Sequence, residues 1–125
     1  MVEVSVNTET GFVKVDRVVA AHSCGRPLNP LQIQSQVNGG VIQGISYALY
    51  EDRVMDESTG HMLNTNLDQY KIAFSMEIPD IEVINIEEYS GRSSTDAYGI
   101  AEPANIATAA AIAPARILAA LGKYS

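Results

Sequence analysis

The feature that most constrains the fold is a helical pattern over residues 30–50. Its apolar residues recur every four positions, which places them on one helix face: Ile33, Val37, Val41 and Ile45. Asn29 is a favourable helix cap and Pro30 is favoured at the first helical position. The sequence therefore predicts a long amphipathic helix that begins at Pro30 and packs against a core.

Three glycines, Gly39, Gly40 and Gly44, lie inside this predicted helix. Each lowers helix stability by about 1 kcal/mol relative to alanine, so their presence needs a reason. One explanation is close packing against a neighbouring element, and the other is close approach of a ligand. Gln36 and Gln43 share a face with Gly40 and would offer amide groups to a polar cofactor with phosphates or a pterin edge. The sequence leaves both explanations open.

The first half of the chain also predicts strands. Residues 2–6 alternate apolar and polar, residues 7–11 are typical of a turn, and residues 12–21 are rich in valine. Together they predict a β-hairpin. Residues 51–64 predict a second hairpin around a turn at residues 56–60.

The second half predicts a loop over residues 64–73, a strand over residues 81–89 and an alanine-rich helix over residues 104–121. Pro114 is expected to kink or split that helix, and Gly122 is expected to end it. We expect one α+β domain over residues 1–125, in which an antiparallel sheet of β-hairpins packs on the glycine-containing central helix and the alanine-rich C-terminal helix.

Composition excludes several functions. The net charge is −7 and the basic residues are scattered, which argues against nucleic-acid binding. The sequence shows neither an apolar run long enough to span a membrane nor a signal-peptide pattern. Cys24 is the lone cysteine, which suits a reducing compartment. We expect a cytoplasmic protein.

Two further positions are candidates for chemistry. Glu102 precedes Pro103 at a predicted helix start, where it is either a carboxylate at the positive end of the helix dipole or a general base. His22 and Cys24 are close in sequence, but His61 is the only other histidine, which is too few ligands for structural zinc. We expect no metal held by protein ligands.

Four sequence blocks, in order, resemble the xanthine dehydrogenase / aldehyde oxidase family of molybdenum hydroxylases. They are Cys24–Pro30 with the segment Gln36–Gly44, then Asp68–Ile72, Ile78–Pro79, and Gly99–Pro103 with the alanine-rich helix that follows. The resemblance covers nearly the whole chain. It identifies the chain with the C-terminal part of the molybdopterin-binding large subunit. The chain departs from the family at Ala101, where glycine is common.

The resemblance implies an oxidoreductase that hydroxylates an aldehyde or N-heterocycle with oxygen derived from water. Its cofactor is molybdenum on a molybdopterin, usually the cytosine dinucleotide in bacteria. Glu102 takes the position of the catalytic base, and Gln36, Gly39, Gly40 and Gln43 match the segment that binds the pterin. Electrons leave through iron–sulfur clusters and FAD on other domains or subunits.

A complete subunit of this family is several times longer than 125 residues. We therefore expect the isolated chain to be inactive, to hold no cofactor, to pair with the remainder of the subunit, and to expose surface that favours self-association. The alternative is a non-catalytic interaction or assembly module derived from the family.

Overall fold

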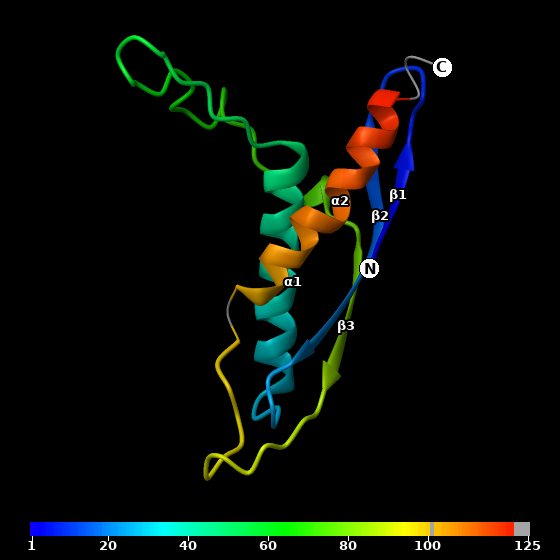
Figure 1. Ribbon diagram of the computed structural model, residues 1–125, viewed down its shortest axis with the longest axis vertical. Coiled ribbons are helices and arrows are strands. Elements are labelled where there is room, and N and C mark those ends of the chain that lie inside the picture. The colour runs from blue at the N-terminus through cyan, green and yellow to red at the C-terminus, as the bar shows by residue number, and fades with distance from the viewer. Residues whose placement is uncertain (101, 122–125) are drawn as a thin grey trace.

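The computed structural model describes residues 1–100 and 102–121, with only the backbone at positions 116 and 118–120. Three strands and two long helices form two layers (Figure 1). The sheet has the strand order β1-β2-β3, and both helices lie on one of its faces. The α+β class predicted from sequence is confirmed.

The predicted first hairpin is confirmed. Strands β1 (Val2–Val6) and β2 (Val13–Ser23) pair antiparallel through a turn in which Gly11 has φ +74°. A β-bulge interrupts the pairing, because Val4 faces Val15 while Glu3 faces Arg17. The extra residue of β2 reverses which side chains face the helices. The buried residues are therefore Val13 and Val15 before the bulge, and Val18 and Ala20 after it.

Strand β3 (Asp80–Ile86) begins directly after Pro79, as predicted, but it ends earlier and pairs parallel to β2. The predicted antiparallel sheet is therefore wrong for this strand, and the sheet is mixed. The physical reason is the connection. Helix α1 (Pro30–Leu49) lies between the two strands and carries the chain back along the sheet, which is how parallel neighbours are joined.

Both predicted helices are present. Helix α1 begins where Asn29 Oδ1 accepts the Gln32 backbone N–H at 3.2 Å, with Pro30 in its first turn. Helix α2 (Pro103–Leu121) runs through Pro114 without interruption, so the expected split does not occur. Pro114 and Ala110 are both exposed, which lets water satisfy the Ala110 carbonyl that proline cannot bond. The expected stop at Gly122 lies outside the described residues.

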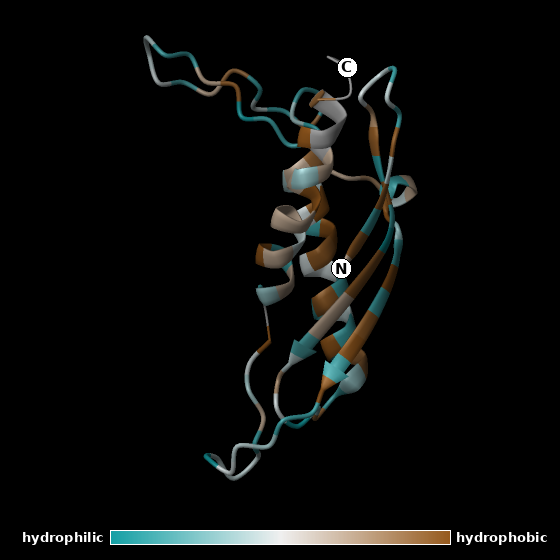
Figure 2. Ribbon diagram, turned by 45° about the vertical axis from the view of Figure 1, so that its right-hand side comes forward, coloured by the Kyte–Doolittle hydropathy of each residue, from teal (hydrophilic) through white to brown (hydrophobic). Residues whose placement is uncertain are grey.

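Helix α1 packs against α2, β2 and β3, and α2 packs against β1 and β2. In Figure 2 the brown of hydrophobic residues recurs along both helices and along the strands. Within the described ranges, the largest fully buried side chains are Ile45, Ile112, Val37 and Val41. Three of these four lie on the apolar stripe that the sequence predicted for α1.

Residues 51–74 leave the end of α1 as an extended arm that projects from the body (Figure 1). The predicted second hairpin is only partly formed: the chain turns at Asp56–Gly60, but a single bridge joins Met55 to Met62 and no strand is built. A two-stranded hairpin with no packing partner is marginal, which explains the loss of regular pairing. No helix of the described part is long and apolar enough to cross a membrane.

Candidate functional site

The residues that the sequence analysis assigned to the catalytic base and to the pterin-binding segment line one cleft between α1 and the start of α2. The cleft has a volume of about 300 Å³ and is lined by Ser35, Gln36, Gly39, Gly40, Gln43 and Glu102. All five of these assigned residues, Gln36, Gly39, Gly40, Gln43 and Glu102, are in this list. They come from two helices that are about 60 residues apart in sequence, and the helix–helix packing brings them together.

Glu102 reaches the cleft because it stands directly before the first residue of α2. Its backbone carbonyl accepts the Asn105 N–H at 3.0 Å, which fixes the residue to the first turn of the helix. Its side chain is exposed and forms no hydrogen bond or ion pair with a described residue. Within the described part of the chain, both carboxylate oxygens are therefore unpaired, at the positive end of a helix dipole. Ala101, where the chain departs from the family, lies outside the described residues.

The three glycines of α1 divide between the two explanations that the sequence left open. A Cβ added to Gly44 would lie 2.7 Å from the Thr108 Cβ, and one added to Gly40 would lie 3.0 Å from the Ala104 Cβ. These two glycines allow α1 and α2 to approach closely. A Cβ added to Gly39 would meet nothing within 4 Å. Packing therefore does not explain Gly39, which stands bare and exposed in the cleft wall.

The two glutamines of the cleft differ in their bonding. Gln43 Oε1 accepts a hydrogen bond from Asn105 Nδ2 at 3.1 Å, and Gln43 Nε2 donates to the Tyr47 hydroxyl at 2.7 Å. This chain of bonds ties α1 to α2 beside the cleft. Gln36 forms no side-chain hydrogen bond with the described residues, so its amide is available to a ligand.

Sequence reasoning missed Ser35 and Asn105. Ser35 lies four residues before Gly39 and therefore on the same helix face, so helical spacing could have found it. The side chain of Asn105 reaches the site through its hydrogen bond to Gln43 across the helix interface. No signal local to the sequence predicts that contact.

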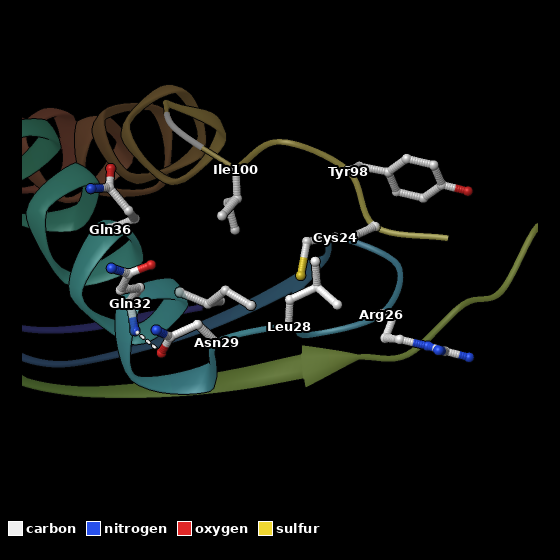
Figure 3. A pocket seen from close by; sticks show the side chains of 10 residues that line it. Cys24, Arg26, Leu28, Asn29, Gln32, Gln36, Tyr98 and Ile100 are labelled. Atoms are coloured by element: carbon white, nitrogen blue, oxygen red, sulfur yellow. Dashed lines mark hydrogen bonds between the residues drawn. The ribbon is translucent and has the colours of Figure 1, made fainter. Parts of the chain in front are cut away.

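A second hollow of about 230 Å³ lies beside the first turns of α1 and shares Gln36 with the cleft. In Figure 3 the buried thiol of Cys24 and the Ile100 side chain both point into this hollow, while Arg26 points away from it. Across the described residues, no group of three His, Cys, Asp or Glu side chains is placed to hold a metal ion. From the His22–Cys24 segment, Cys24 contributes its buried thiol to the wall of this hollow.

The chain is similar to a family model and to curated proteins. The family model described as the molybdopterin cofactor-binding domain matches residues 1–79. The chain is 33% identical to the xanthine dehydrogenase molybdenum-binding subunit of Escherichia coli O157:H7 over 89% of its length. It is 36% identical to the aldehyde oxidoreductase molybdenum-binding subunit of Escherichia coli strain K12 over 91% of its length.

The fold is also shared with solved structures. Quinoline 2-oxidoreductase from Pseudomonas putida 86 superimposes with a TM-score of 0.81 and 31% identity, over 88% of this chain and 14% of that one. The two curated relatives are much longer, and this chain spans 15% and 16% of their lengths.

Proposed function

Because the chain belongs to the molybdopterin cofactor-binding domain family, we propose that it supplies the general base and part of the pterin-binding surface of a molybdenum-dependent oxidoreductase. The observation that carries the proposal is the convergence of Gln36, Gly39, Gln43 and Glu102 on one cleft. A set of amides, a bare backbone and a free carboxylate suits a polar heterocycle beside a proton-transfer step.

The residues of the cleft fit the cofactor. Gly39 leaves a cradle that a side chain would occupy, because its missing Cβ would point into open space in the cleft wall. The free amide of Gln36 offers donors and an acceptor to a pterin edge. Gln43, fixed by Asn105 and Tyr47, holds the far side of the same surface. When bound, the molybdenum cofactor, which we propose carries the cytosine dinucleotide, supplies the redox centre.

Glu102 is the proposed general base. Its carboxylate would accept the proton of the water-derived nucleophile that attacks an electron-poor carbon of an aldehyde or N-heterocycle. That carbon loses its hydrogen as a hydride, and the cofactor, when bound, would accept the two electrons. General-base catalysis of this kind is typically worth about 10²–10⁴-fold in rate. Attachment to the first turn of α2 holds the carboxylate at the cleft, and none of the described residues binds it, which supports its availability for proton transfer.

The rest of the activity belongs to other parts of the enzyme in this proposal. The chain spans 15% of the length of its xanthine dehydrogenase relative, so the remainder of the subunit supplies the other cofactor contacts and the substrate pocket. Iron–sulfur clusters and FAD on further domains or subunits carry the electrons away.

A chimeric subunit, here called the graft, tests the proposal. The aligned segment of the Escherichia coli aldehyde oxidoreductase molybdenum-binding subunit is replaced by this chain, and molybdenum content and aldehyde oxidation are measured. We expect the graft to retain molybdenum and turn over. Gly39→Leu, which fills the cradle, is expected to lower molybdenum content. Gln34→Ala, on the same helix outside the cleft, serves as the matched control. Equal molybdenum in both variants would contradict the assignment of the cleft.

The alternative of a non-catalytic assembly module predicts a different pattern. The arm at residues 51–74 and the exposed apolar side chains on it favour a docking role: Val54, Met55, Leu63 and Leu67. If assembly were the whole function, the graft would form a stable subunit whose molybdenum content does not depend on Gly39. Molybdenum content thus separates the two functions.

A further inference from the structure

Strand β2 continues well past the start of β1. Val2 pairs with Val18, and one further rung joins Met1 to Val19: the Met1 ammonium donates to the Val19 carbonyl at 2.8 Å, and the Val19 N–H donates to the Met1 carbonyl at 2.9 Å. Beyond that rung β2 runs on to Ser23. Figure 1 shows the N-terminus beside the middle of β2, not at its end.

The remaining part of β2 has one open edge. Backbone groups of alternate residues point to the same side of a strand, so Ala21 and Ser23 point to the edge that Val19 uses for Met1. On the opposite edge β2 pairs with β3 as far as Ser23. In the described chain no third strand follows β1 along the open edge. Ala21 and Ser23 are both exposed there.

A groove runs along this open edge. It has a volume of about 310 Å³, and its walls are residues 18–22 of β2 and the small side chains of α2 at Ala104, Ala107 and Ala111. The alanines recur at three- and four-residue spacing, so they share one helix face. The groove therefore offers unpaired backbone groups on one wall and a shallow apolar surface on the other.

We propose that this groove is a strand-addition site. Its occupant is an extended segment of the remaining polypeptide of the molybdenum-binding subunit, which lies antiparallel to β2 and in line with β1. Two observations select that occupant. Met1 already has the pairing of a strand residue, so a segment in line with it meets Ala21 and then Ser23. The chain also spans only 15% of its xanthine dehydrogenase relative, which leaves a large polypeptide to supply the strand.

The register defines the side chains that the groove accepts. Val2 and Val18 are opposite one another and face the helices, so the first and third residues upstream of Met1 share that face. The first lies opposite Ala20 and the third opposite His22. These positions take small or β-branched apolar residues, and the alternate positions, which point away from α2, take polar ones.

A direct extension of the chain tests the site. Val-Thr-Val-Thr-Val is fused before Met1 without a linker, and Gly-Pro-Gly-Pro-Gly is fused in a matched control, because proline cannot donate to a strand ladder. Amide hydrogen exchange at Ala21 and Ser23 is followed by NMR. We expect exchange at both amides to slow by about tenfold or more with the valine extension, and the outer edge of β3 to stay unchanged as an internal control.

One further substitution and a concentration series sharpen the outcome. Ala107→Glu places a charge in the groove at an exposed position, and it is expected to restore fast exchange in the extended chain. Equal exchange with the two extensions would overturn the proposal. Protection of Ala21 that rises with concentration in the unextended chain would also overturn it, since the occupant would then be a second copy.

The choice of occupant rests on the proposed function, while strand addition itself does not, since the extension experiment involves no molybdenum. In the grafted subunit, exchange of the peptide that contains Ala21 and Ser23 is expected to be slower than in the isolated chain by about tenfold. If exchange in the assembled graft equalled that in the isolated chain, the remaining polypeptide would not be the occupant of the groove. This would hold even where the graft contains molybdenum and turns over.

Discussion

Gly44 on α1 lies so close to Thr108 on α2 that a Cβ on Gly44 would stand 2.7 Å from the Thr108 Cβ and 2.9 Å from the Asn105 carbonyl oxygen. This contact sets the separation of the two helices. The candidate cleft depends on that separation, because Glu102 enters it from the start of α2 while Gln36 and Gly39 enter from α1. The same helix interface therefore determines both the stability of the fold and the geometry of the cleft.

Gly44→Ala is expected to destabilise the protein by about 1–3 kcal/mol. The added methyl meets backbone and a side chain that cannot easily move, since Thr108 is buried and its hydroxyl donates to the Ala104 carbonyl at 2.7 Å. The loss exceeds the gain from removing a helical glycine. Urea unfolding measures the change, and an unchanged or raised free energy of unfolding would show that the helices are not in close contact here.

Gly39→Ala is expected to act in the opposite direction. An alanine Cβ at this position meets nothing within 4 Å, so the helix gains about 0.5–1 kcal/mol with no clash. The same urea titration compares it with Gly44→Ala. A destabilised Gly39→Ala variant would mean that Gly39 serves packing, and would remove the argument that it makes room for a ligand.

Helix α1 and its glycines show how much of the fold and of the site the sequence could predict. Helical spacing at Ile33, Val37 and Val41 predicted α1, and Asn29 with Pro30 predicted its start, because caps and periodicity are local properties. The sequence could not assign the glycines to packing or to ligand approach. That distinction depends on α2, which lies about 60 residues away.

The direction of β3 was wrong for a related reason. Alternating apolar residues predict a strand but carry no information on its partner's direction, and the helix between β2 and β3 decides the parallel pairing. Five of the residues that line the cleft were found from sequence through motif order. Asn105 was not, because its role is a hydrogen bond to Gln43 across the helix interface.

Asn64→Ala is expected to loosen the arm without unfolding the body. Asn64 is buried, its Oδ1 accepts the Val54 N–H at 3.0 Å, and its Nδ2 donates to the Asp52 carbonyl at 2.6 Å. Removal leaves both backbone groups unpaired, at a local loss of about 1–3 kcal/mol. Trypsin cleavage after Arg53 should accelerate, while Asn66→Ala, at an exposed position, should leave the rate unchanged. Equal cleavage in both variants would refute a bracing role for Asn64.

The lowered pKa of Glu77 predicts that the stability of the fold depends on pH. The hydrogen bond from Lys71 and then the Phe74 N–H lower the pKa of this carboxyl below its ordinary value of 4.5. A lowered pKa means that the ionised form stabilises the fold above pH 4.5, and that this contribution disappears as the pH falls through the lowered pKa. Glu77→Gln should therefore flatten the fall in melting temperature between pH 5 and 3. Glu88→Gln is the charge-matched control, and equal slopes in the two variants would count against the interaction.

The most direct test of the central claim is turnover by the grafted aldehyde oxidoreductase subunit with Glu102→Gln, measured alongside its molybdenum content. The substitution keeps the shape of the side chain and removes the proton acceptor. We expect aldehyde oxidation per molybdenum to fall by about 10²-fold or more while molybdenum content stays that of the unsubstituted graft. Glu88→Gln, outside the cleft, should change neither. Turnover at the unsubstituted rate by the Glu102→Gln graft would contradict the assignment of Glu102 as the general base.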